Sequence, residues 1–127
     1  MIALAGYTGL AGFLWLALFQ ALLAAGLPLG HMAWGRADRR LPPQKRWASL
    51  AVVPLALIGA LVVAQAAGIG PAILPDILIR PALGAFAALF ALGLVGNAAS
   101  NSRAERLHGV PLALILAAST GALALGV

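Results

Sequence analysis

The sequence predicts an all-α membrane protein, a four-transmembrane-helix bundle that forms a single domain over residues 1–127. Two observations predict this fold. The chain is 63% hydrophobic and only 9% charged, whereas a soluble domain carries about 25% charged residues. Its apolar residues also form four long blocks, and a block of about 18 or more apolar residues is typical of a helix that crosses the bilayer.

The four predicted spans cover about residues 2–28, 47–67, 81–100 and 110–127. Prolines help to set their limits. Pro42 and Pro43 disfavour a continuous helix through the first polar loop, because the residue before a proline avoids the helical region. Pro54 lies inside the second span, where neighbouring helices can bond the carbonyl that it frees. We expect Pro75 to open a short helical turn in the outer interface, ahead of a third span that begins near Pro81.

The basic residues predict the orientation of the chain. Seven of the eight Lys and Arg residues lie in the first and third loops, at residues 31–46 and 101–109, and only Arg80 lies in the second loop. Cytoplasmic loops are enriched in Lys and Arg, so we expect these two loops to be cytoplasmic and both termini to lie outside. No positive residue precedes the first block, as it would in a cleaved signal peptide, so we expect this block to remain as a helix.

The two halves of the sequence resemble each other. Residues 36–39 read Arg-Ala-Asp-Arg and residues 103–106 read Arg-Ala-Glu-Arg, while residues 17–19 and 88–90 both read Ala-Leu-Phe. Each half would form a helix, a basic loop and a second helix in the same orientation, as in parallel membrane repeats. The fold would then consist of two parallel-repeat helical hairpins. Because Ala and Leu are so common in this chain, chance similarity is the alternative.

Several functions are disfavoured by the composition of the spans. No Asp, Glu, Lys or Arg falls inside them, and a proton-coupled transporter needs a titratable group within the membrane. The net charge of +5 lies beside apolar blocks, where it suits anionic lipid head groups and not nucleic acid. The chain has no cysteine and only two histidines, which is too few for the usual ligand set of a metal site. We expect no catalytic residue, no cofactor and no metal.

The polar side chains inside the spans are uncharged, namely Thr8, Gln20, Gln65, Asn97, Ser119 and Thr120. Such groups commonly form hydrogen bonds between helices, worth about 0.6–2 kcal/mol each. Gln20 and Gln65 are the candidates for intramembrane polar contacts, and the alternative is that one of them lines a polar path. Small residues allow helices to approach closely. Those expected to do so within the bundle, with dimerisation as the alternative, are Gly26 and Gly30 in the first span and Gly84, Ala88, Gly93 and Gly96 in the third.

The most polar cluster lies at the predicted cytoplasmic mouth. Asn97, Asn101 and Glu105 recur every four residues, which places them on one face if the third helix continues. The structural interpretation is a helix end whose polar groups satisfy the backbone, with Glu105 paired to an arginine of the first loop. The functional alternative is a small site for a lipid head group or an anion. That site would comprise His31, Trp34, Arg36, Asn97, Ser100, Asn101, Glu105 and Arg106.

These segments also carry a resemblance to a known family. Together, residues 26–30, 33–35, 41–42, 97–106 and Pro111 resemble the pattern of an uncharacterised family of small four-helix integral membrane proteins from high-GC bacteria, actinobacteria among them. The resemblance covers most of the chain and implies a protein of the bacterial inner (plasma) membrane with no assigned activity. Residues 36–38 depart from the pattern, because relatives tend to have a glycine and a basic or aromatic residue there. The glutathione-linked four-helix membrane enzymes are not supported, since their Arg-, Asn- and Glu-rich signature after the first helix is absent.

Two functions of different class follow from these observations. The first is a non-enzymatic integral membrane protein with an accessory, structural or lipid-interacting role, whose partners are membrane lipids, a second copy of the chain or another membrane protein. The alternative is a small oligomeric channel or facilitator for a small solute or ion, because four short helices can hardly enclose a wide pore alone. An oligomer with Gln20, Gln65 or Asn97 on an aqueous axis would favour this alternative.

Overall fold

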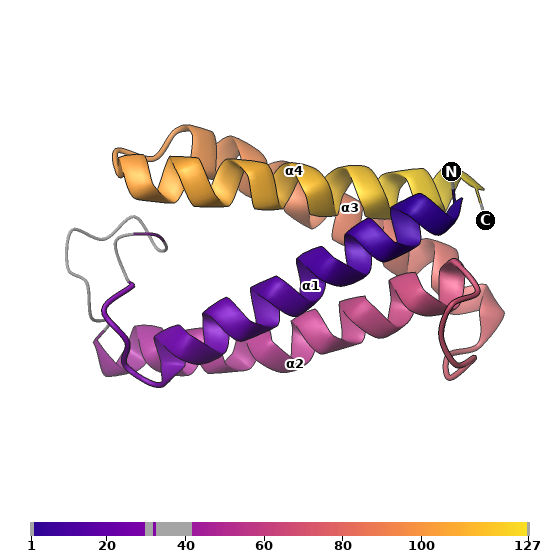
Figure 1. Cartoon of the computed structure of the whole chain (residues 1–127), viewed down its shortest axis with the longest axis horizontal. Helices are drawn as coiled ribbons and strands as arrows, with labels where there is room; N and C mark the ends of the chain where they lie inside the picture. The colour runs from indigo at the N-terminus through magenta and orange to yellow at the C-terminus, as the bar shows by residue number, and fades with distance from the viewer. Residues whose placement is uncertain (1, 30–31, 33–41, 127) are drawn as a thin grey trace.

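Four α-helices make up the described part of the chain, which is residues 2–29, 32 and 42–126 of a computed structural model (Figure 1). They are α1 (Ile2–Ala24), α2 (Pro43–Ala66), α3 (Asp76–Ala98) and α4 (Arg103–Gly126). These residues contain no strand. The prediction of an all-α four-helix bundle is therefore confirmed.

Each of the four helices is long and apolar enough to cross a membrane. With 23 or 24 residues, a helix extends about 35 Å, compared with a hydrocarbon thickness of about 30 Å. Large apolar side chains also face outward, and Leu125 is 88% exposed, Ile77 82% and Leu92 73%. Acyl chains can cover such a surface, whereas water cannot do so favourably. The chain is a multi-pass membrane protein.

Three helices begin earlier in the sequence than the predicted spans do. The first residue is Pro43 in α2, Asp76 in α3 and Arg103 in α4. In α3 the turn that follows Pro75 does not stop but continues through Pro81 as one helix. A proline this close to a helix start disturbs only the first carbonyls, so the helix can extend upstream of it. As a result, the charged side chains of the described residues lie in the first two turns of the helices, close to the membrane surface.

The helices form two hairpins, α1 with α2 and α3 with α4, which meet mainly where α1 packs on α4. The contacts of α2 with the second hairpin are few. Both termini lie at one end of the bundle, and the hairpins diverge toward the opposite end (Figure 1). Because α3 packs almost entirely on α4, it is the least buried of the four helices. The hairpins agree with the predicted layout, and the duplication of the two halves stays a prediction.

Close packing near the termini depends on glycines of α1 that recur every three residues. A Cβ atom added at Gly6 would collide with the Cβ atom of Ala67. One added at Gly12 would lie 2.9 Å from a methyl carbon of Leu116, on α4. Gly9 lies between them on the same face, and its added Cβ would also be in tight contact with α4. The absence of side chains at these positions therefore lets α1 fit between α2 and α4.

The small residues chosen from the sequence behave differently. A Cβ atom added at Gly84, Gly93 or Gly96 would meet no atom within 4 Å. The prediction that these glycines of α3 mediate close packing in the bundle is therefore wrong, because α3 packs mainly on α4 and has few contacts with the first hairpin. Gly26 adopts a φ of 93°, a left-handed conformation that glycine tolerates and that follows the end of α1. Gly30 lies outside the described residues.

Candidate functional site

A cavity of about 420 Å³ lies between the two hairpins, within the range of about 300–1,000 Å³ that is usual for small-molecule sites. All four helices contribute to its wall, together with Met32. The wall residues of α3 and α4 lie toward the α3–α4 connection, at the end of the bundle where the hairpins diverge (Figure 1). The cavity therefore exists because α1 leans on α4 near the termini and separates from it toward the other end.

Aromatic side chains form the apolar part of the wall. The ring centroid of Phe13 lies 5.2 Å from that of Phe86 and 5.5 Å from that of Phe90, both in edge-to-face arrangements. Such pairs contribute about 0.5–1.5 kcal/mol each beyond their burial. Phe13 also lies on Gly59 of α2, where an added Cβ atom would collide with the ring. Phe13 thus connects α1, α2 and α3 and fixes this side of the cavity.

Three uncharged polar side chains line the cavity, and they come from Gln20 of α1, Asn97 of α3 and His108 of α4. Gln20 Oε1 is buried and has no hydrogen-bond partner among the described residues. A buried polar atom without a partner costs about 1–3 kcal/mol, and such atoms are rare in folded proteins. Gln20 Oε1 therefore offers a hydrogen-bond acceptor to a molecule in the cavity.

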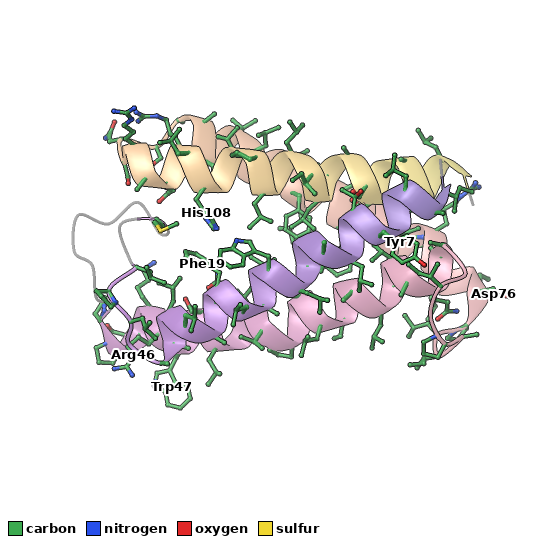
Figure 2. The ribbon with its side chains drawn as sticks, viewed as in Figure 1. Tyr7, Phe19, Arg46, Trp47, Asp76 and His108 are labelled. Carbon is green, nitrogen blue, oxygen red and sulfur yellow. The ribbon has the colours of Figure 1, made fainter. Side chains whose placement is uncertain are left out.

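His108 is held by two aromatic residues of α1. The indole N–H of Trp15 donates to His108 Nε2 over 2.7 Å, and the ring centroid of Phe19 lies 4.3 Å from that of the imidazole. Figure 2 shows the side chains of His108 and Phe19 pointing toward each other across the space between α4 and α1. Because an indole nitrogen can only donate, Nε2 carries the lone pair and the proton of the neutral imidazole is on Nδ1. The N–H donor of the neutral His108 imidazole is therefore at Nδ1.

Two glycines shape the wall that α3 and α4 supply. A Cβ atom added at Gly109 would lie 2.5 Å from Asn97 Cγ, so the Asn97 amide packs directly on the backbone of α4. At Gly93, by contrast, an added Cβ atom would meet nothing within 4 Å, although this residue lines the cavity. Gly93 therefore lines the cavity with room for a Cβ atom at its position.

The predicted cytoplasmic-mouth site is only partly brought together. Asn97 lines the cavity, but Ser100, Asn101 and Arg106 do not. A guanidinium N–H of Arg106 donates to the backbone oxygen of Ser100 over 2.6 Å, which closes the turn between α3 and α4. The side chain of Asn101 is exposed. For these residues the contacts match the structural interpretation, a helix end with a satisfied backbone.

The remaining residues of that predicted site divide into two groups. Glu105 is buried, and its backbone N–H donates to Ser102 Oγ over 3.2 Å at the start of α4. It is outside the cavity wall. His31, Trp34 and Arg36 lie outside the described residues. The arginines among residues 33–41, with which Glu105 was expected to pair, lie outside them as well. The wall of the cavity therefore draws on Asn97 from the predicted set and on Gln20 from the predicted intramembrane contacts.

Gln65 has contacts with the backbone at the far end of α2. Its amide N–H donates to the oxygen of Leu74 over 2.7 Å. Its Oε1 accepts from the N–H groups of Ile73 at 3.0 Å and Leu74 at 2.9 Å. These three hydrogen bonds fasten the α2–α3 connection to the end of α2, so both ends of the Gln65 amide are engaged in holding a loop.

Sequence reasoning did not identify the aromatic wall, the open space at Gly93 or the contact of His108 with α1. One signal pointed to the aromatic residues. The two Ala-Leu-Phe segments place Phe19 and Phe90 at corresponding positions of the two halves, and both side chains line the cavity. An approximate symmetry between the hairpins would bring such residues to the same central space.

The described wall of the cavity contains no Asp, Glu, Lys or Arg. In the part of the chain that the structure describes, no group of three His, Asp or Glu side chains is placed to hold a metal ion. The wall is therefore mostly apolar, with amide and imidazole groups as its polar components. Such a wall suits an uncharged molecule with a large apolar part.

Comparisons with protein families, with curated proteins and with solved structures found no match to this chain. Its class is therefore defined by the fold and the site. The chain is a multi-pass α-helical membrane protein whose two hairpins enclose a mostly apolar cavity, with Gln20, Asn97 and His108 as the polar groups on the wall.

Proposed function

We propose that this chain is a non-enzymatic, lipid-interacting membrane protein that binds a neutral lipid with one apolar chain and a hydroxyl group in the inter-hairpin cavity. The observation that carries the proposal is Gln20 Oε1, a buried acceptor without a partner in the described chain, on an otherwise mostly apolar wall. Ligand sites in proteins commonly combine an apolar wall with a few placed polar groups that fix the orientation of the ligand.

The ligand is expected to be uncharged. A carboxylate or phosphate in the cavity would lose its hydration without gaining a cation, because no Lys or Arg occurs among the described wall residues. Moving an unpaired ion into a medium of low dielectric constant is strongly unfavourable. A hydroxyl group can both donate and accept, so it suits Gln20 Oε1 and the Nδ1–H of His108.

The lipid can enter directly from the membrane between α2 and α3, which make few contacts with each other. Leu55 of α2 and Leu89 of α3 both line the cavity and are 44% and 48% exposed, respectively. These leucines therefore belong to both the cavity wall and the lipid-facing surface. An acyl chain that crosses between them would stay in apolar surroundings throughout.

The orientation predicted from the basic residues is also part of the proposal. We place the chain in the inner membrane of a bacterium, with residues 31–46 and 101–109 on the cytoplasmic side. Support comes from the positive-inside rule and from the family resemblance. Asn97 is then in the last turn of α3 and His108 in the second turn of α4, both near the cytoplasmic surface. That depth suits the head group of a lipid from the cytoplasmic leaflet.

The small channel or facilitator has less support from the contacts. Toward the termini, Gly6, Gly9 and Gly12 bring α1 tightly against its neighbours, which leaves little room for a path beyond the cavity in a single chain. Gln65, a candidate for a polar path, is bonded to the backbone of the α2–α3 connection. A mostly apolar cavity beside this tightly packed region favours binding over conduction.

Binding of radiolabelled monooleoylglycerol to the purified chain in detergent micelles tests the proposal. Gly93→Leu should place a leucine side chain in the cavity and weaken binding at least about tenfold, equivalent to about 1.4 kcal/mol, because that side chain would occupy space that the ligand needs. Gly96→Leu is the matched control, because Gly96 also has no atom within 4 Å of an added Cβ but is exposed and does not line the cavity. Binding by Gly96→Leu should equal that of the wild type.

A second variant separates recognition of the hydroxyl group from apolar contact. Gln20→Leu keeps the size of the side chain but removes the acceptor. It should weaken binding of monooleoylglycerol about threefold to tenfold, the equivalent of one hydrogen bond of about 0.5–1.5 kcal/mol. Binding of methyl oleate, which has no hydroxyl donor, should not weaken. If Gly93→Leu and Gln20→Leu both bind the monoacylglycerol as well as the wild type does, the proposed function is wrong.

A further inference from the structure

A second groove lies on the first hairpin and shares no wall residue with the inter-hairpin cavity. Its volume is about 580 Å³, and it runs between the last turns of α1 and the first turns of α2. Alanines of α1 form one side, and Trp47, Leu50 and Val53 of α2 form the other. Among the described residues of this wall, Arg46 is charged and the others are apolar.

The cation of Arg46 is held in place at the end of the groove. Its Nε–H donates to the backbone oxygen of Ala24 over 3.0 Å, one of the carbonyls that lack a helical partner at the end of α1. Its guanidinium also lies against the turn at Gly26, where an added Cβ atom would be 3.2 Å from Nη2. The positive end of the α2 dipole adds to the charge at this position. The groove therefore has an apolar length and a fixed positive end.

We propose that this groove binds one anionic phospholipid, with the phosphate on Arg46 and one acyl chain along Leu50 and Val53. Guanidinium groups pair strongly with phosphate oxygens. Trp47 is 70% exposed and neighbours Arg46 at the same end of the hairpin (Figure 2), the position at which tryptophan contacts the head-group region of a bilayer. Residues 46–53 extend about 10 Å along the helix axis, which matches the upper part of an acyl chain.

Arg80 makes a comparable contact at the opposite end of the bundle. Its Nε–H donates to the backbone oxygen of Ala124 over 3.0 Å, so both arginines bind a carbonyl in the last turn of a neighbouring helix. Arg80, however, lines neither the groove nor the inter-hairpin cavity. It therefore separates the effect of a surface charge and a capped helix end from the effect of the groove.

Quenching of Trp47 fluorescence by brominated lipids in vesicles tests the site. The chain has three tryptophans, so Trp15→Phe and Trp34→Phe are combined to leave Trp47 as the reporter. Vesicles of phosphatidylcholine receive either brominated phosphatidylglycerol or brominated phosphatidylcholine in small amounts. At the groove we expect a preference of about fivefold for the anionic lipid, the effect of one basic residue near the surface.

Variants of the two arginines in this background decide the outcome, with circular dichroism as the check on folding. Arg46→Gln should abolish the preference, Arg46→Lys should keep most of it because the charge remains, and Arg80→Gln should leave it unchanged. Equal quenching by the two lipids before any change at Arg46 would overturn the proposal. So would a preference that survives Arg46→Gln, or one that Arg80→Gln reduces to the same extent. None of these outcomes bears on the inter-hairpin cavity, whose ligand is uncharged.

Discussion

The indole of Trp15 and the imidazole of His108 are joined by a hydrogen bond of 2.7 Å, which links α1 to α4 beside the inter-hairpin cavity. The same imidazole lines the cavity and packs on Phe19. The residue that holds the hairpins together therefore also forms part of the candidate site. A ligand bound at this wall would stabilise the bundle, since it binds only the folded arrangement.

A double-mutant cycle on Trp15 and His108 measures the strength of this link. We expect Trp15→Phe and His108→Phe to show a coupling of about 0.6–1.7 kcal/mol, the range of hydrogen bonds between membrane helices. The measurement is the unfolding free energy of each single variant and of the double variant in mixed micelles. Strictly additive losses would mean that the hydrogen bond contributes nothing to the packing of the hairpins.

Alanine at Gly59 should destabilise the bundle, whereas alanine at Gly84 should not. A Cβ atom at Gly59 would collide with the Phe13 ring, whereas one at Gly84 would meet no atom within 4 Å. We expect Gly59→Ala to destabilise the bundle by about 1–3 kcal/mol through overpacking. Gly84→Ala should be neutral or stabilising by up to about 1 kcal/mol, because alanine is the better helix former. The same unfolding assay compares them, and equal effects would contradict the packing described for α2.

Loss of the Gln65 amide should loosen the α2–α3 connection. Gln65→Leu removes three hydrogen bonds to the backbone of Ile73 and Leu74, and we expect destabilisation of about 2 kcal/mol from the groups left unpaired. Hydrogen–deuterium exchange should become faster at Ile73 and Leu74. Gln65→Glu keeps the acceptor for both N–H groups and should lose less protection. Unchanged exchange in Gln65→Leu would show that this contact does not order the connection.

Cysteine labelling tests the predicted orientation, and the absence of native cysteine makes single-cysteine variants direct reporters. Three exposed positions serve for this test: Gln44 in the first turn of α2, Ala72 in the α2–α3 connection and Asn101 in the α3–α4 connection. A membrane-impermeant maleimide added to intact cells should label Ala72→Cys, and it should label Gln44→Cys and Asn101→Cys only after permeabilisation. The reverse pattern would contradict the positive-inside assignment, and labelling of Gln44→Cys and Asn101→Cys from opposite sides would contradict the four-span layout.

The four helices were predictable because long apolar runs and the absence of charge depend on residue type alone. The residue at which α3 begins depends on more than residue type. Pro81 disfavours a continuous helix locally, yet the chain is helical from Asp76 through Pro81. Whether a proline begins a helix or lies inside one is decided by packing around it, which the sequence pattern does not contain.

The candidate site was less accessible to sequence reasoning than the fold. Gln20 and Asn97 were identifiable as polar residues in or beside apolar runs, but their common location depends on how α1 and α3 approach α4. Gly93 looked like a packing residue, but no described atom lies close to an added Cβ there, because α3 packs mainly on α4. A cavity is formed by what neighbouring helices do not fill, so it becomes visible only once all four are placed.

Nuclear Overhauser effects between a bound monoacylglycerol and the chain in lipid nanodiscs test the central claim, that the space between the hairpins holds a neutral lipid. Acyl-chain protons should show contacts with the ring protons of Phe13 and Phe90, and glycerol protons should show contacts with the side-chain amide of Gln20. In Gly93→Leu these contacts should disappear. Contacts confined to outward-facing side chains such as Leu92 and Leu125 would show that the lipid only surrounds the bundle, and would contradict the account.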